Sequence, residues 1–347
     1  MNNKMINFDP AQYAEAFARD GYVHIRQGVT EEFYSKLLNQ VDENLRARSM
    51  KEFALGNKQQ AKYEFPDDGD YVQEFFDAVG KVCGLKPGEL VFSERHIKAY
   101  QADAEPSPRA HKDRFASQIS VGISVHVQQG STLVLYPDEM TDVNPFNSTR
   151  ELWASLGPDG YPEQALKSVR SVEIQDSPGD MIMFHGNSFW HLRKNAALTT
   201  MLYLKLNAFN CDPLGEDPCS EGFRGHTQKS IALDDVQLEQ LVPMIGRRVD
   251  CFHRHYNRDW KEVLGVVLWN EDHLTIDEQE FALLQAVDGK RNLKTILPSL
   301  ISNGNQVDVF QKVRRLADLG VLDLVNQEQD QEHSSPVEVF DERTLSA

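Results

Sequence analysis

The most constraining feature of the sequence is a ten-residue stretch, 118–127, in which apolar and small polar residues alternate without a break. The apolar positions are Ile119, Val121, Ile123, Val125 and Val127. Successive side chains of a strand point to opposite faces, so this period of two predicts a half-buried β-strand. Gly130 and Ser131 predict a turn after it, and we expect a return strand at residues 133–136.

Helices are expected before this strand, and further strands after it. Asp9-Pro10 is a typical helix start, and so is Thr30 followed by two glutamates, with a short strand expected at 22–25 between the two helices. The polar stretch 58–70 predicts a loop, and 138–164 predicts a long surface excursion that could cover a pocket. Further strands are expected at 171–174, 180–184 and 198–209. This order favours a β-sandwich or barrel supported by helices.

The composition changes near residue 260, which indicates a second, smaller domain. Helices are predicted at 275–287, 292–301 and 307–319, and a strand at 321–325. Three helices and one strand in so short a segment predict a winged-helix-like unit. We therefore expect domains at 1–260 and 261–325. The tail at 326–347 has six acids against one arginine and is expected to be disordered.

Charge and cysteine content exclude several classes of protein. The net charge of −17 disfavours a nucleic-acid partner. No apolar run is long enough for a transmembrane helix, and the first residues lack the apolar stretch of a secretory signal. The four cysteines are far apart and form no CxxC pair, which disfavours a zinc ribbon or a disulfide framework. We expect a cytoplasmic protein that binds neither nucleic acid nor membrane and that can form oligomers.

A candidate metal motif, His111-Lys112-Asp113, comes just before the alternating strand. Residues i and i+2 of an extended chain point the same way, so the imidazole and the carboxylate converge. Such a pair supplies two of the three ligands of a 2-His-1-carboxylate site, although a single HxD is expected roughly once by chance in a chain of this composition.

A second block makes the pattern specific. Pro178-Gly179-Asp180 leads into the apolar residues 181–184, which are followed by His185 and His191. Together with the segment FARDGYV at 17–23, the HxD and this block resemble the phytanoyl-CoA-dioxygenase-like branch of the Fe(II)/2-oxoglutarate-dependent oxygenases, over roughly residues 10–210. Residues 178–191 also bear some likeness to JmjC-type oxygenases, and the C-terminal segment is similar to winged-helix modules that hold peptides or end some of those enzymes.

The resemblance implies an α+β fold, with a double-stranded β-helix (jelly-roll, cupin-like) core, N-terminal helices and the small C-terminal domain. It implies that His111, Asp113 and His191 bind Fe(II), with His185 as the competitor of His191. It also implies that 2-oxoglutarate and O₂ are co-substrates. Because the carboxylate ligand is retained at Asp113, the resemblance implies hydroxylation or a related oxidation and not halogenation.

The sequence departs from this family at the residue that anchors 2-oxoglutarate. The family usually has an arginine about eleven residues after the distal histidine, and Leu202 stands there. Lys205 on the same strand is a possible substitute, and Lys98, Arg95 and Arg193 are alternatives. A solvent-exposed role for Lys205 stays open as well.

Three residues near the motifs are candidates for substrate binding. Arg109 and Arg114 flank the HxD and could steer an anionic substrate, or could simply be solvated. Trp190 could line the pocket or pack near the iron.

The expected activity is the oxidation of a small-molecule biosynthetic or amino-acid-like substrate. The alternatives are a protein or peptide hydroxylase that binds its substrate through the C-terminal domain, and a non-catalytic cupin-like binding protein.

Overall fold

The structure is a computed structural model of the chain. It describes residues 4–47, 50–53, 58–104, 109–139, 166–212, 214–219, 233–246, 249–257, 259–268, 273–300 and 306–326. The excursion expected at 138–164 lies almost entirely outside these residues, and so does the tail expected from residue 326 on.

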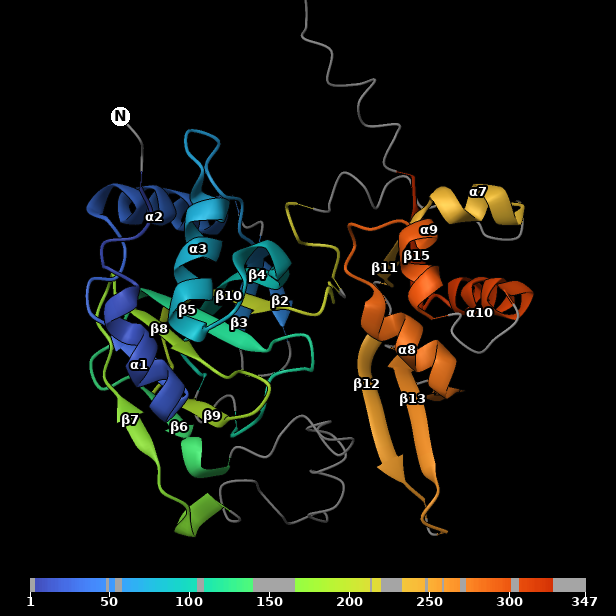
Figure 1. Ribbon diagram of the computed structural model, residues 1–347. Helices are drawn as coiled ribbons and strands as arrows, with labels where there is room; N and C mark the ends of the chain where they lie inside the picture. The colour runs from blue at the N-terminus through green and yellow to red at the C-terminus, as the bar shows by residue number, and fades with distance from the viewer. Residues whose placement is uncertain are drawn as a thin grey trace, which may run out of the picture.

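Two antiparallel sheets form the N-terminal part of the described chain (Figure 1). The larger sheet has seven described strands in the order β1-β8-β5-β10-β4-β3-β2, and the smaller has three in the order β7-β6-β9. The strands of the larger sheet are β1 (Tyr22–Ile25), β2 (Lys51–Phe53), β3 (Lys58–Lys62), β4 (Val91–Tyr100), β5 (Ile119–His126), β8 (Met181–Phe184) and β10 (Thr200–Asn207). Those of the smaller sheet are β6 (Thr132–Tyr136), β7 (Val172–Ile174) and β9 (Trp190–Lys194).

From β5 onward the chain passes repeatedly from one sheet to the other. Strands β5, β8 and β10 belong to the larger sheet, and β6, β7 and β9 to the smaller. This winding is that of a double-stranded β-helix, which the family resemblance implied. The strand expected at 133–136 is present as β6, and it pairs with β7 and β9 of the smaller sheet. Because β6 belongs to the smaller sheet, its Leu133 and Leu135 pack against Ile182 and Phe184 of the larger sheet.

Three helices cover the outer face of the larger sheet (Figure 1). They are α1 (Ala11–Asp20), α2 (Glu31–Arg46) and α3 (Tyr71–Cys83). The predicted start of α2 is confirmed, since the Thr30 hydroxyl accepts a hydrogen bond from the Phe33 amide at 3.2 Å. Helix α1 ends at Gly21, whose φ of +73° favours glycine. The apolar side chains of these helices form one core with the outward-facing residues of the strands beneath them.

Both faces of β5 are buried, although the sequence predicted burial of only one. The apolar face packs under the helices, and the small polar face points into the space between the two sheets, where Ser120 and Ser124 make hydrogen bonds. The loop expected at 58–70 is also wrong in its first part, because Lys58–Lys62 forms β3 and pairs with β4. The polarity that suggested a loop arises in part because Lys58 is directed into the interior.

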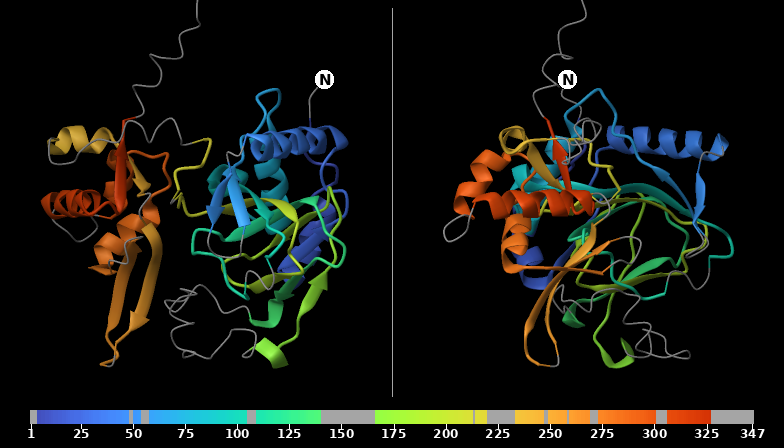
Figure 2. Two further views of the ribbon diagram at one scale, coloured as in Figure 1. Left: turned by 180° about the vertical axis from the view of Figure 1, so that it is seen from behind. Right: turned by 90° about the vertical axis from the view of Figure 1, so that its right-hand side faces the viewer.

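A C-terminal unit, residues 233–326, lies beside this barrel (Figure 2). Its elements are α7 (Asp235–Gln240), β11 (Val242–Ile245), β12 (Val249–Tyr256), β13 (Glu262–Leu268), β14 (His273–Ile276), α8 (Glu278–Ala286), α9 (Leu293–Ile296), α10 (Gln306–Asp318) and β15 (Leu322–Val325). Short 3-10 helices occur at Pro87–Glu89, Pro137–Glu139, Leu166–Ser168 and Leu297–Ser299. None of the helices in the described ranges is long and apolar enough to cross a membrane.

The C-terminal unit contains the helices and the last strand that the sequence predicted. In addition, β15 pairs with β11, and β12, β13 and β14 form a three-stranded sheet. One apolar core joins all of these elements, so it includes residues on both sides of the boundary expected at 260. The winged-helix-like character of this unit stays a prediction.

Candidate metal centre

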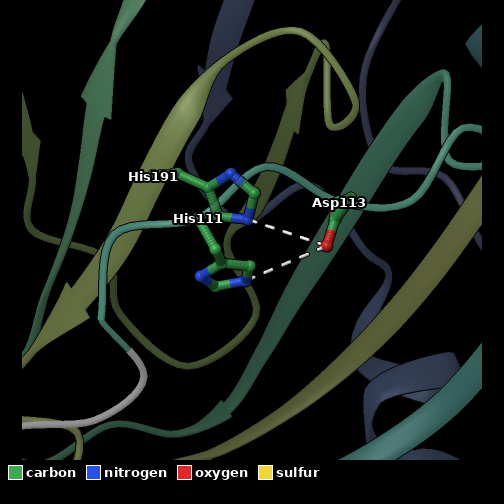
Figure 3. Close-up of side chains that lie close together, drawn as sticks. All are labelled: His111, Asp113 and His191. Atoms are coloured by element: carbon green, nitrogen blue, oxygen red, sulfur yellow. Dashed lines mark ion pairs between the residues drawn. The ribbon is translucent and has the colours of Figure 1, made fainter. Parts of the chain in front are cut away.

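The side chains of His111, Asp113 and His191 meet between the two sheets (Figure 3). His191 lies on β9, and the backbone of His111 pairs with it through two hydrogen bonds of 3.0 and 2.9 Å. The Asp113 Oδ1 atom lies 4.0 Å from Nε2 of His111 and 3.8 Å from Nε2 of His191. One donor atom from each residue falls within 4.8 Å of the others, which is close enough for all three to bind one metal ion.

Backbone carbonyls fix the orientation of both imidazoles. Nδ1 of His111 donates to the Arg109 carbonyl at 2.8 Å, and Nδ1 of His191 donates to the Phe189 carbonyl at 3.0 Å. Each Nε2 therefore keeps its lone pair and directs it toward Asp113, as a metal ligand requires. Burial lowers the pKa of both histidines, that of His111 to about 3, so the rings are neutral at physiological pH.

The carboxylate of Asp113 is held from two sides. Ser120 donates to its Oδ2 at 2.6 Å, and the Lys205 ammonium donates to Oδ1 at 2.6 Å. Burial opposes ionisation of Asp113, but the charge and hydrogen bond of Lys205, together with the neighbouring His191 and His111, hold the pKa of Asp113 below its usual range. Gly186 makes room for this arrangement, since a Cβ there would lie 2.1 Å from the Ser120 hydroxyl.

The structure separates the two histidines that competed for the distal position. His185 is directed away from His111 and Asp113. Its ring packs against those of Phe17 and Phe189, with centroids 5.0 and 5.9 Å away. Of the two, His191 joins His111 and Asp113.

A cavity with cationic walls adjoins the three residues. Among the described residues, four cations line it, against the single lining carboxylate of Asp113. The residues that line it besides the His-Asp-His group are Lys58, Lys98, Tyr100, Leu133, Arg193, Tyr203 and Lys205. Glu94 compensates part of this charge, because it pairs with the ammonium of Lys98 and lies 3.6 Å from that of Lys205. Of the four cations proposed from the sequence as co-substrate ligands, Lys205, Lys98 and Arg193 line this cavity.

Arg193 is the most firmly positioned of these cations. Its two Nη atoms donate to the two oxygens of Asp176 at 2.9 Å, and Nη1 also donates to Ser131 at 3.1 Å. The residue is 3% exposed. Its Nε atom is buried and makes no hydrogen bond to any described residue. A buried donor without a partner is costly, so this N–H is suited to a bound acceptor.

The register of β10 explains why position 202, where the resembled family usually has its 2-oxoglutarate-binding arginine, cannot contribute to the cavity. Leu202 belongs to the core under the helices, on the outer face of the sheet, whereas Tyr203 and Lys205 line the cavity. Arg95 also points away from the cavity, because it is bonded to the Tyr63 carbonyl and to Glu64.

The residues predicted to bind substrate do not line this cavity within the described part of the chain. Trp190 lies on the other face of β9, in a small apolar cluster, with Lys112 over its ring. Arg109 contributes its backbone carbonyl to His111. Burial raises the pKa of Asp250, and the nearby charge of Arg114 opposes part of this rise. A substrate contact for these three residues stays a prediction.

Sequence reasoning missed several residues of the site. Ser120 and Asp176 hold other site residues, and Lys58, Tyr100 and Tyr203 line the cavity. A signal existed for Tyr203 and Tyr100, since each is two positions from a proposed cation on the same strand. Lys58 carried no such signal, because its strand was expected to be a loop.

Comparisons with known proteins found similar chains among solved structures only. No protein-family model and no curated protein matched the sequence. Among solved structures, this chain is similar to the non-heme alpha ketoglutarate dependent carbocyclase SnoK from nogalamycin biosynthesis (TM-score 0.44, 11% identity, 56% of this chain and 82% of that one). It is also similar to the epimerase SnoN from the same biosynthesis (0.42, 14%, 57% and 84%) and to a Pseudomonas putida prolyl-4-hydroxylase (0.40, 12%, 57% and 98%). At such TM-scores, the side chains of the site and not the likeness must carry a functional conclusion.

Proposed function

We propose that this chain is a non-haem Fe(II)/2-oxoglutarate-dependent dioxygenase that oxidises a C–H bond of a small molecule. The observation that carries the proposal is the convergence of His111, Asp113 and His191, with both Nε2 lone pairs directed toward one carboxylate oxygen, at the wall of a cationic cavity.

The donor set fits ferrous iron. Two neutral imidazoles and one carboxylate on one side of a metal form the 2-His-1-carboxylate arrangement, which leaves the opposite positions open. With 2-oxoglutarate and O₂, iron held in this way supplies the oxidising power for C–H oxidation. The protein holds the donors in place through the Arg109 and Phe189 carbonyls and the Ser120 hydroxyl.

The cavity walls fit a dicarboxylate. Among the described residues, four cations line the space and three carboxylates, Asp113, Glu94 and Asp176, pair with them, so a bound anion would meet a surplus of positive charge. We propose that the Nε–H of Arg193 donates to the distal carboxylate of 2-oxoglutarate. This donor is buried, has no described partner and belongs to a residue that lines the cavity. Lys98 and the hydroxyls of Tyr100 and Tyr203 line the same cavity and would complete the anion site. Lys205 sits at the metal end, on Asp113.

The proposed substrate class rests on the remaining polar groups between the sheets. Lys58 and Glu94 place charges of both signs close to the cavity, which suits a small polar or amino-acid-like molecule. The carboxylate of Asp113 would take one coordination position of the metal, and this supports hydroxylation or a related oxidation.

The test is an anaerobic titration of Fe(II)-loaded protein with 2-oxoglutarate. A keto acid chelated to ferrous iron gives a visible charge-transfer band, which we expect for the wild type. The variant His191→Ala should lose the band, and the matched control His185→Ala should keep it. Absence of the band in the wild type, or its survival in His191→Ala, would contradict the proposal. Iron-dependent release of succinate, stimulated by added amino acids or other small metabolites but not by peptides, would then define the substrate class.

A further inference from the structure

The loop that carries Asp113 lies between the barrel and the C-terminal unit. We define it as the ligand loop, residues 113–117. On the barrel side its backbone is held by hydrogen bonds: the Asp113 amide donates to the Gly186 carbonyl at 2.9 Å, and Asn187 donates to the Phe115 carbonyl at 2.9 Å. Asn207 donates to the Ala116 carbonyl, also at 2.9 Å.

On the other side, the C-terminal unit packs directly against the same loop. The ring of Phe115 meets the ring of Phe252 on β12 edge to face, with centroids 5.8 Å apart and an interplanar angle of 89°. Ala116 is fully buried and belongs to the apolar core of the C-terminal unit. The charge of Arg114 acts on Asp250, also on β12. Three successive residues after a metal-ligand candidate therefore interact with this unit.

The three metal-ligand candidates thus depend on different parts of the molecule. The rings of His111 and His191 are oriented by carbonyls of the barrel segments beside β9. Asp113 is in the ligand loop, which the barrel and the C-terminal unit hold together. A shift of this loop would move Asp113 relative to two imidazoles that stay in place, and metal binding is sensitive to such displacements.

We propose that the C-terminal unit is a structural part of the metal centre, and that Phe252 is a positioning residue that acts on Asp113 through Phe115. This inference rests on the proposed metal site. It gives the C-terminal unit a role in holding the metal, separate from any role in substrate binding.

The first test measures binding of Co²⁺ alone, by calorimetry and by its ligand-field absorption. Phe252→Ala should weaken Co²⁺ binding about tenfold, at the lower end of the effect of residues that support metal ligands, and should alter the band shape. Phe252→Tyr keeps the ring and should restore both properties. Tyr256→Ala removes a 60% exposed ring from the same strand and should bind as the wild type does. Circular dichroism and the unfolding midpoint of each metal-free variant report the state of the fold separately.

A double-mutant cycle tests whether the effect passes through Phe115. Phe115→Leu, Phe252→Leu and the double variant keep apolar volume, so they remain informative if Phe252→Ala fails to fold. We expect the double variant to bind Co²⁺ no more weakly than Phe115→Leu alone. Simple additivity, or wild-type Co²⁺ binding by Phe252→Ala, would overturn the inference. A wild type that binds no Co²⁺ would instead overturn the metal site and the proposed function.

Discussion

The two faces of the larger sheet are built from the same strands but differ in polarity and in role. The outer face is apolar and packs under α1, α2 and α3, with Ile97, Val121 and Leu204 among its residues. The inner face is equally buried, but it carries Glu94, Lys98, Ser120, Tyr203 and Lys205. The alternation of residues in β4, β5 and β10 therefore separates the stabilising core from the proposed chemistry.

The charged residues between the two sheets are buried in pairs of opposite charge. Lys205 pairs with Asp113 and lies near Glu94, Glu94 pairs with Lys98, and Arg193 pairs with Asp176. An isolated buried charge would cost several kcal/mol, whereas a network of opposite charges is tolerated. Substitutions on the outer face should then change stability alone, and those on the inner face should change ligand binding as well.

The largest expected effect comes from Lys205→Met. It leaves Asp113 and Glu94 buried without their shared cation, and we expect the metal-free protein to lose roughly 3–5 kcal/mol of unfolding free energy. Added Co²⁺ should restore more stability to this variant than to the wild type, because the metal replaces the lost positive charge at Asp113. Urea unfolding with and without Co²⁺ measures both quantities. A metal-free variant as stable as the wild type would contradict the pairing.

Leu204→Ala tests the outer face. Loss of a fully buried leucine should cost about 3 kcal/mol of unfolding free energy. The affinity for Co²⁺ should stay within about twofold of the wild type, because Leu204 points away from the cavity. Urea unfolding and calorimetry check the two values. A large loss of Co²⁺ affinity in folded protein would show that the two faces are not independent.

Arg193→Lys tests the anion end of the cavity. Lysine cannot form the two-point pair with Asp176 and still offer a third donor, so the affinity for 2-oxoglutarate should fall about tenfold, or about 1.4 kcal/mol. Binding of Co²⁺ without the keto acid should not change. The matched control is Arg170→Lys, since Arg170 makes a similar pair with Asp138 on the surface. Equal effects of the two substitutions would exclude Arg193 as the anchor.

The smallest expected effect is a dependence on pH through Lys58. Burial, with the charges of Lys98 and Lys205, lowers the pKa of Lys58 to about 7. Its ammonium is therefore present below that pH and lost above it, and a dianion binds better to the protonated form. The affinity for 2-oxoglutarate should fall about threefold from about pH 6 to about pH 8, and Lys58→Met should flatten this dependence. A steeper dependence in the variant would assign the titration to another group.

The sequence predicted the parts of the fold that depend on local patterns. The alternation at 118–127 predicted β5, Thr30 predicted the start of α2, and the HxD spacing brought His111 and Asp113 together. The distal histidine followed only from the resemblance, which left His185 open as the alternative.

The rest depends on contacts across the fold, which leave no local pattern. Residues 133–136 were expected to form a strand, but only the winding between two sheets determines that this strand pairs with β7 and β9. The polar residues 58–62 looked like a loop because a strand that faces a charged cavity lacks apolar residues. Arg193 differs from the other cations through its pair with Asp176, and nothing in the sequence links these two positions.

Strand β5 supports both ends of the cavity. Its Ser120 holds Asp113, and its Ser124 donates to Asp176, which in turn holds Arg193. The two serines are four residues apart, which corresponds to about 13 Å of extended chain. One strand thus sets the separation between Asp113 and the guanidinium of Arg193. For the proposed co-substrate site, this spacing predicts that keto acids one methylene shorter or longer than 2-oxoglutarate would match one end only.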